Sequence, residues 1–274
     1  EDTNYRKEFG GWETAAIKFH NSVDTVISGN LIRGVYRQKE GAFGIWIDFG
    51  NQGVRISGNV IYNTQAETVF LEMDHGPTLV DNNVLIGQPV RSNSEATVFT
   101  HNLFVDCLYN YNPDVKRRSQ YYKPHTTIEA GRKEGVPQDE KWFNNIFVRQ
   151  GLDKAKAAAG YTSDFNVFLE GAAKSSFGDE HSVVDAFATD LKREDKPLGV
   201  TLTFSMNDAP FSVKGPWVDG ELAGVFETVG QTIEDRSGQP IKVDTDFNGA
   251  KYTRPVAGPL AGLKQGLNTV TWSI

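Results

Sequence analysis

The sequence is poor in cysteine, in long apolar runs and in positive charge, and each shortage excludes a class of protein. Its 274 residues include one cysteine, which excludes an internal disulfide framework and a cysteine-rich zinc site. The apolar runs are only a few residues long, too short to cross a bilayer. A net charge of −7 argues against nonspecific binding to nucleic-acid phosphates. We therefore expect a folded protein that binds neither membrane nor nucleic acid.

The sequence does contain an internal repeat. Six short segments share the order apolar, polar, polar, Asn, apolar, apolar, and their asparagines are Asn30, Asn59, Asn83, Asn102, Asn145 and Asn166. The spacings between them are 29, 24, 19, 43 and 21 residues, and the 43 corresponds to two periods or to one period with an insertion. A period in the low twenties with β-rich segments predicts stacked coils, with the asparagines in a ladder at one turn. A leucine-rich repeat is disfavoured because its Leu-x-x-Leu-x-Leu consensus is absent.

The repeat predicts an all-β protein, a right-handed parallel β-helix (a solenoid) followed by a small C-terminal antiparallel β unit. Residues 1–176 are expected to form the coils and to carry the active site. Within them, residues 109–141 are expected to form an insertion loop, because they fill the longest gap between repeats.

The pattern changes after residue 176. Residues 177–196 are predicted to be a linker with a short helix over 184–195, where apolar side chains recur on one helical face. Residues 197–274 are predicted to form the antiparallel unit. Its strands are expected at 200–206 and 267–274, where polar and apolar side chains alternate.

Two acidic residues occupy equivalent places in successive repeats. Asp48 lies 11 residues before Asn59, and Glu72 lies 11 residues before Asn83. The alternation along each strand points both side chains outward, on neighbouring strands that are about 4.7–4.9 Å apart. A separation of about 5–5.5 Å is typical of the two carboxylates of a retaining glycosidase. Repulsion between them is expected to raise the pKa of one, as a general acid requires.

Other side chains are expected to surround this pair. Outward aromatic rings on the same strands favour a sugar-binding surface over a solvated one, and basic residues on adjacent coils extend the column of acids. The candidate substrate-binding residues are His20, Lys18, Trp46, Phe70, His75, Arg91 and His125. No metal or other cofactor is predicted. The segment that begins at Asp244 opens like a calcium loop, but its twelfth position is Pro255 instead of glutamate.

These residues resemble glycoside hydrolase family 120, retaining β-xylosidases built on a right-handed parallel β-helix. The resemblance covers roughly residues 12–274. It rests on the motifs Gly44-Ile45-Trp46-Ile47-Asp48, Phe70-Leu71-Glu72-Met73-Asp74-His75-Gly76-Pro77, Val80-Asp81-Asn82-Asn83, Pro124-His125-Thr126-Thr127 and Gly258-Pro259-Leu260. It implies that Asp48 is the nucleophile and Glu72 the acid/base of an exo-acting xylosidase that takes part in xylan degradation.

Family members are about twice as long as this chain, with further coils and an inserted β-sandwich before these motifs. We therefore expect the chain to be the C-terminal portion of a longer enzyme or a short relative. An N-terminal segment of the same enzyme or a second copy of the chain is a possible partner, beside the oligosaccharide substrate. The composition suits a bacterial cytoplasm as well as a periplasmic or secreted protein.

Two alternatives remain at the level of sequence. A polysaccharide lyase is another common occupant of parallel β-helices, and His20, Lys18 or Arg91 would supply its base, although two acids would repel an anionic uronate. A non-catalytic carbohydrate-binding solenoid is the other alternative, in which Asp48 and Glu72 are surface residues.

Overall fold

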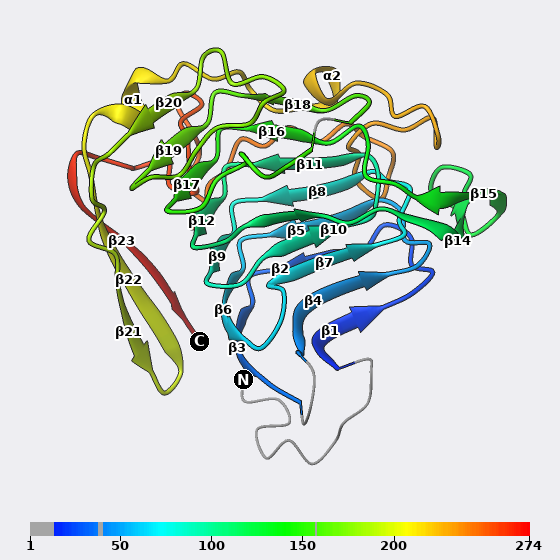
Figure 1. Cartoon of the computed structure of the whole chain (residues 1–274), viewed down its shortest axis with the longest axis horizontal. Coiled ribbons are helices and arrows are strands. Elements are labelled where there is room, and N and C mark those ends of the chain that lie inside the picture. The colour runs from blue at the N-terminus through cyan, green and yellow to red at the C-terminus, as the bar shows by residue number, and fades with distance from the viewer. Residues whose placement is uncertain (1–13, 38–40, 157) are drawn as a thin grey trace.

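The computed structural model describes residues 14–37, 41–156 and 158–274 (Figure 1). Nearly all of its regular structure is β, and three parallel sheets dominate it. In the described residues the helices are two single turns, α1 (Ala209–Ser212) and α2 (Gly220–Ala223). No helix in this part of the chain is long and apolar enough to cross a membrane.

The strands of each parallel sheet recur at a regular interval along the chain. The first sheet contains, in spatial order, β1 (Ala15–Phe19), β4 (Phe43–Asp48), β7 (Val69–Glu72), β10 (Val90–Ser92) and β13 (Tyr109–Tyr111). The second contains β2 (Val26–Ser28), β5 (Val54–Ser57), β8 (Thr78–Asp81), β11 (Thr97–Thr100), β16 (Lys141–Phe143) and β18 (Thr162–Asp164). The third contains β3 (Leu31–Val35), β6 (Val60–Thr64), β9 (Val84–Ile86), β12 (Leu103–Val105), β17 (Ile146–Val148), β19 (Val167–Leu169) and β20 (Val183–Asp185).

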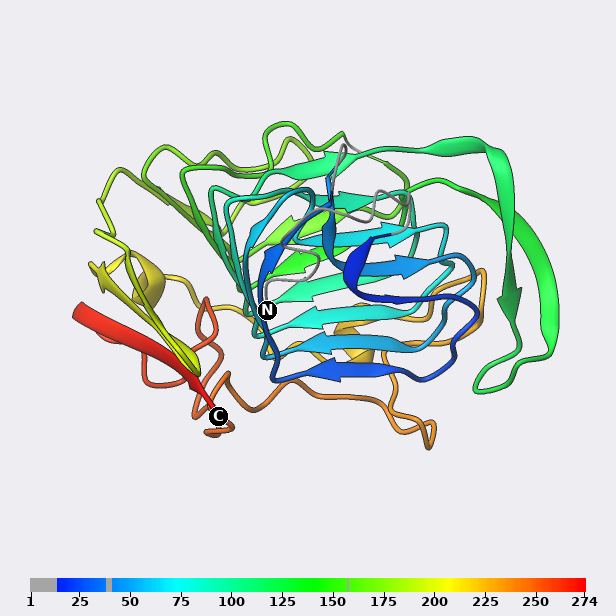
Figure 2. The same ribbon diagram turned by 90° about the horizontal axis from the view of Figure 1, so that it is seen from below.

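The chain visits the three sheets in turn and then starts again one strand further along, which stacks its coils on one another. In Figure 2 the stack is seen from below, from the end that holds β1 to β3. This arrangement is consistent with the predicted parallel β-helix.

The predicted asparagine ladder is confirmed. Asn59 Nδ2 donates to Asn83 Oδ1 at 2.9 Å, and Asn83 Nδ2 donates to Asn102 Oδ1 at 3.0 Å. Asn102 continues the same pattern to Asn145, and Asn145 to Asn166. Each amide is buried, so the ladder satisfies polar groups that water does not reach.

Alternation along the strands divides the apolar side chains between an inner core and two outer layers. Inward residues of all three sheets form one cluster inside the coils, including Ile45, Leu71 and Phe104. Phenylalanine rings stack from coil to coil, with 4.8 Å between the ring centroids of Phe104 and Phe147 and 5.0 Å between those of Phe147 and Phe168. This continuous core holds the sheets in register.

The C-terminal part of the chain covers the outside of the third sheet. The antiparallel strands β21 (Lys192–Lys196), β22 (Gly199–Met206) and β23 (Gly266–Ser273) form a small antiparallel sheet, as predicted, but its first strand lies in the segment predicted to be a linker. Inner residues of β22 such as Leu202 pack with outward residues of the third sheet such as Val84 in a second cluster. Figure 1 shows these strands on the side of the solenoid opposite to β14 and β15.

The prediction of a short helix over residues 184–195 is wrong. That segment supplies the end of β20, which adds to the third sheet, and the start of β21. Val184 is exposed, so the apolar spacing there does not mark a buried helical face. Pairing with β19 satisfies the backbone in place of helical hydrogen bonds.

The outer face of the second sheet is covered as well. Irregular chain beyond β22 lays Val218, Phe226 and Ile233 against Leu79 and Val98 in a third cluster. None of the three clusters includes the outward side chains of β4 and β7 on the first sheet. The predicted acids lie on that remaining face.

The predicted insertion is a hairpin. Its first residues belong to β13, and the rest forms the antiparallel pair β14 (Asp114–Tyr122) and β15 (Glu129–Gly135) before the chain re-enters the solenoid at β16. Figures 1 and 2 show the pair extending from one side of the coils.

Candidate active site

Asp48 and Glu72 lie directly opposite each other on β4 and β7. The two strands pair in parallel with Asp48 in register with Glu72, as the repeat spacing predicts. Neighbouring strands are about 4.7–4.9 Å apart, so the backbones that carry the two carboxyl groups are separated by about that distance. Asp48 is 3% exposed and Glu72 6% exposed, so both lie in a desolvated setting.

Two basic side chains from β1 and the residue after it approach Asp48. Lys18 Nζ lies 2.8 Å and His20 Nε2 lies 3.2 Å from the same oxygen, Asp48 Oδ2. The other oxygen, Oδ1, is buried and has no hydrogen-bond partner within the described part of the chain. The carboxylate is therefore fixed by one oxygen and presents the second without a competing donor.

Glu72 is held by a donor on each oxygen. Trp46 Nε1 donates to Glu72 Oε2 at 2.9 Å, and a guanidinium nitrogen of Arg117 donates to Oε1 at 2.5 Å. Burial raises the pKa of Glu72, and the charge of Asp48 adds to the effect, while Arg117 opposes it. A carboxyl with a raised pKa is suited to donate a proton.

Arg117 is a site residue that the sequence prediction did not include. It lies on β14, 45 residues after Glu72, and its side chain also bonds Asp114 Oδ2 at 2.5 Å. The repeat gives no register for an insertion, so the only signal in the sequence was the concentration of basic residues in the hairpin.

Asp74 is a second residue outside the predicted set. It is fully buried and accepts hydrogen bonds from the backbone and side chain of Asn51 at 2.8 and 3.0 Å. Burial raises the pKa of Asp74 well above its usual range, and the charges of Asp48 and Glu72 act in the same direction. Asn51 also donates to the backbone oxygen of Asp48, which ties the turn after β4 to the coil above.

The predicted aromatic residues lie beside the acids but pack on each other. The ring centroids of Trp46 and Phe70 are 5.5 Å apart, and Phe43 lies 4.6 Å from Trp46. Lys18 Nζ lies 4.0 Å from the Trp46 ring. Trp46 and Phe70 are 8% and 3% exposed, so their rings present little surface on which a sugar could stack. The contact that Trp46 makes with the acid pair is its N–H bond to Glu72.

The prediction that Arg91 continues the column of acids is wrong. Arg91 is in register with Phe70, and its guanidinium lies 4.4 Å over that ring. The coil that contains β10 has only 19 residues between ladder asparagines. The residue of this coil that is level with Glu72 therefore lies fewer than 11 residues before Asn102. Asn93 lies beside this turn and accepts a hydrogen bond from the backbone of Met73 at 2.9 Å.

The structure does not bring His75 or His125 to the acids. His75 is 1% exposed and bonds Glu95 and Ser119. His125, in the turn between β14 and β15, bridges Asp24 and Glu234. Among the described residues, these two histidines connect separate segments of the chain and do not contact Asp48 or Glu72.

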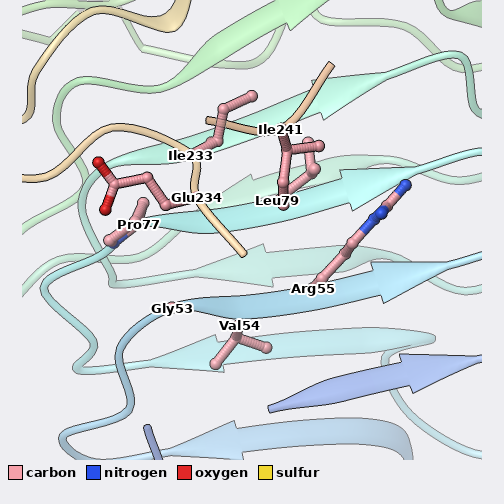
Figure 3. A pocket seen from close by; sticks show the side chains of 8 residues that line it. All are labelled: Gly53, Val54, Arg55, Pro77, Leu79, Ile233, Glu234 and Ile241. Carbon is pink, nitrogen blue, oxygen red and sulfur yellow. The ribbon is translucent and has the colours of Figure 1, made fainter. Parts of the chain in front are cut away.

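A small cavity elsewhere has no room for a sugar. It lies between the outer side of β5 and β8 and the C-terminal segment, and its volume is about 10 Å³ (Figure 3). That is space for about one water molecule. Arg55 at its edge forms an ion pair with Asp81. In the described residues, no group of three His, Cys, Asp or Glu side chains is placed to hold a metal ion.

The fold and site together define an all-β protein of stacked parallel sheets with a pair of buried carboxylates on the outer face of the first sheet. No protein-family model and no curated protein matches the chain. Among solved structures it is similar to XylC, described as a complex with xylose, with a TM-score of 0.83 and 26% sequence identity. The match covers 97% of this chain and 46% of XylC, so the chain spans about half the length of that protein.

Proposed function

We propose that the chain hydrolyses β-xylosidic bonds at the end of xylo-oligosaccharides with retention of configuration. The observation that carries the proposal is the register of Asp48 with Glu72 on adjacent strands, which suits the narrow carboxylate separation of retaining enzymes. The likeness to XylC, a protein solved with xylose, supports xylose as the sugar. We extend the proposal to a right-handed β-helix of the family 120 type.

In the first step of the proposed reaction Asp48 Oδ1 attacks the anomeric carbon. The bond to the leaving oxygen breaks, and Glu72 gives its proton to that oxygen, leaving a glycosyl ester on Asp48. In the second step Glu72, now a carboxylate, takes a proton from water. The water oxygen attacks the anomeric carbon and frees Asp48, which regenerates both groups without a cofactor.

The surroundings of the two acids support these roles. Lys18 and His20 both contact one oxygen of Asp48, which leaves the other oxygen to attack. Burial raises the pKa of Glu72, which favours the protonated form that begins the reaction. A lyase fits less well, because Lys18 and His20 already face a carboxylate and the acid pair repels a uronate. The completion of the pocket by an N-terminal segment or a second copy remains a prediction.

The test is hydrolysis of an aryl β-xyloside by the full chain and by Asp48→Asn and Glu72→Gln variants. We expect Asp48→Asn to abolish turnover, because no ester can form. Glu72→Gln should slow it by about 10²–10⁴-fold, the usual contribution of general acid–base catalysis. Asp106→Asn is the matched control, since Asp106 lies on another face and pairs with Arg149.

Proton NMR of the first product distinguishes the stereochemical outcomes. Release of β-xylose before mutarotation supports retention, and initial release of α-xylose contradicts the proposed double displacement. Wild-type turnover by the Asp48→Asn variant would overturn the proposal as a whole. A rise in ultraviolet absorbance on a uronate polymer would instead identify a lyase.

A further inference from the structure

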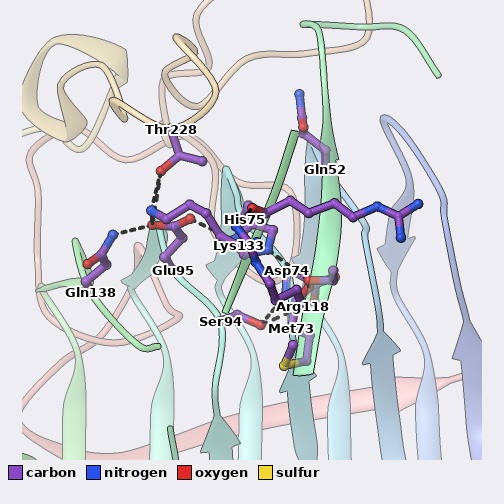
Figure 4. A network of polar contacts seen from close by, with 12 residues as sticks. Gln52, Met73, Asp74, His75, Ser94, Glu95, Arg118, Lys133, Gln138 and Thr228 are labelled. Atoms are coloured by element: carbon purple, nitrogen blue, oxygen red, sulfur yellow. Dashed lines mark hydrogen bonds and ion pairs between the residues drawn. The ribbon is translucent and has the colours of Figure 1, made fainter. Parts of the chain in front are cut away.

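The hairpin β14–β15 is fastened to the solenoid immediately beyond Glu72. Ser119 of β14 donates to the backbone oxygen of Met73, the residue after Glu72, at 2.5 Å. Its Oγ also lies 2.8 Å from His75 Nε2, and His75 Nδ1 lies 2.7 Å from Glu95 Oε1. Figure 4 shows His75 and Glu95 between the coil and the hairpin.

The order Ser119, His75, Glu95 has the connectivity of a nucleophilic triad, but these residues cannot act as one. All three lie in the packed junction between the hairpin and the coils, each at most 3% exposed. The hydroxyl proton of Ser119 is directed to the Met73 carbonyl and not to His75, so the histidine is not placed to act as its base. The arrangement therefore serves as a structural clamp.

Glu95 collects donors from several parts of the chain. Lys133 of β15 lies 2.8 Å from Glu95 Oε2, Thr228 Oγ1 donates to the same oxygen at 3.2 Å, and Gln138 bonds it as well (Figure 4). Burial alone would raise the pKa of Glu95, but His75 and Lys133 outweigh it and lower that pKa. The carboxylate thus joins both strands of the hairpin to the solenoid and to the C-terminal segment.

The same strand carries the cation that contacts Glu72. Arg117 precedes Ser119 by two residues, next to the irregular pairing between Asp114 and Arg118, and the two side chains contact consecutive residues of the coil, Glu72 and Met73. The clamp at Ser119 and the bond from Arg117 to Glu72 therefore lie side by side on one surface of β14. Arg117 is 47% exposed, and besides Glu72 it contacts Asp114 of its own strand and the ring of Phe49 at 4.8 Å, so its place on Glu72 also depends on where β14 lies.

We propose that Ser119, His75 and Glu95 are positioning residues that hold β14 so that Arg117 stays on Glu72. The inference rests on the proposed function only in taking Glu72 as the acid/base. Arg117 would be displaced from Oε1 when a leaving sugar oxygen takes its place, and the clamp would return it afterwards. The protonation of Glu72 is then set by a segment inserted into a neighbouring part of the solenoid, between β13 and β16.

The charged groups that face Glu72 come from three sides. Arg117 lies on β14 and Asp48 on β4, and Asp74 follows Glu72 on its own coil. Lys18 and His20 reach Asp48 from the adjacent coil. Of these, Arg117 is the group that the clamp positions, and it lowers the pKa of Glu72.

The test is a titration of Glu72 by ¹³C NMR in the full chain labelled at glutamate carboxyls, with the signal assigned by its loss in Glu72→Gln. Arg117→Met should raise the titration midpoint by about one pH unit, at the low end for an opposite charge in contact because Arg117 is half exposed. His75→Gln should raise it in the same direction. The double variant should show no more than the Arg117→Met shift, because the clamp acts through Arg117.

Arg132→Met is the matched control. It removes a cation from β15 that pairs with Glu129 and should leave the Glu72 midpoint unchanged. If His75→Gln does not fold, Ser119→Ala removes the clamp's hydroxyl with less disturbance and should give the same shift. The proposal would be overturned if folded His75→Gln or Ser119→Ala kept the wild-type titration midpoint of Glu72. Additive shifts in the double variant would overturn it as well.

The titration requires no turnover, so it separates the two proposals. If the wild-type chain is inactive but the Glu72 midpoint shifts in the variants as expected, the proposed function is contradicted and the positioning role of the clamp is still supported. In an active chain, the basic limb of the kcat/KM profile should move upward with the NMR midpoint in both variants. A purely structural role for His75 would lower stability without moving that limb.

Discussion

At the scale of residues, the fold buries several charged groups and gives each a different form of compensation. Asp48 is paired with Lys18, whose side chain is 12% exposed. Glu95 has several donors, and Asp81 forms an ion pair with Arg55. A buried charge that loses its partner is costly, because its desolvation is no longer offset. These pairs therefore make strong tests of the structure.

Replacement of Lys18 by methionine should lower the free energy of unfolding by about 3 kcal/mol, because it leaves the Asp48 carboxylate buried with a weaker set of partners. The double variant Lys18→Met/Asp48→Asn should recover most of the loss, since the uncompensated charge is gone. Urea unfolding at neutral pH measures both. A double variant that is no more stable than Lys18→Met would contradict this account.

A second prediction concerns Glu140, which is fully buried and accepts a hydrogen bond from Tyr109. Burial raises the pKa of Glu140 to about 7. The folded protein therefore holds this proton more tightly than the unfolded chain does. The contribution to stability is complete below the unfolded pKa, near 4.5, and is lost as the pH rises to about 7. The loss is on the order of 3 kcal/mol.

Glu140→Gln should remove this part of the pH dependence. Thermal unfolding between pH 5 and 8 would show wild-type stability falling across that range and a flatter profile for the variant. Glu134→Gln, at an exposed position on β15, serves as the control. Parallel profiles for the wild type and Glu140→Gln would show that Glu140 does not titrate in this range.

At the scale of elements, the asparagine ladder fixes the register of the coils. Asn102 donates to Val80 O and to Asn145 Oδ1, and its own Oδ1 accepts from the backbone and side chain of Asn83. Every one of these groups is away from water. The amide of each asparagine thus satisfies donors and acceptors in the coils on both sides.

Asn102→Ala should lower the free energy of unfolding by about 3 kcal/mol or more, because it leaves several buried polar groups without a partner. Asn30→Ala is the control at the end of the ladder, where the side chain is partly exposed and water replaces the lost bonds. We expect a loss of about 1 kcal/mol there. Equal losses at the two positions in urea unfolding would show that the ladder is not the source of register.

The ladder also explains how much of this structure could be predicted from the sequence. A constant offset of 11 residues from Asn59 and Asn83 placed Asp48 and Glu72 on adjacent strands. The same offset failed for Arg91, because its coil is shorter. Arg117 lies in the hairpin, where no repeat supplies a register, and its contact with Glu72 depends on tertiary packing.

At the scale of the whole molecule, the C-terminal chain covers two of the three outer faces of the solenoid. The antiparallel strands cover the third sheet, and the irregular segment that holds α2 covers the second. The outer face of the first sheet instead carries the two acids and the cations that contact them, and the hairpin contacts it through Arg117. Alternation predicted the strands of the covering unit, but which face they would cover depends on side-chain packing between distant segments.

The placement of β14–β15 within one coil, between β13 and β16, has a consequence for how such a protein diversifies. The insertion leaves its coil after β13, the strand in the first sheet, and rejoins the same coil at β16, the strand in the second sheet, and the ladder continues past it from Asn102 to Asn145. Hairpins of other lengths and sequences are therefore compatible with the same scaffold. The group that meets Glu72 can therefore be changed within the hairpin without altering β4 and β7, the strands that carry the two carboxylates.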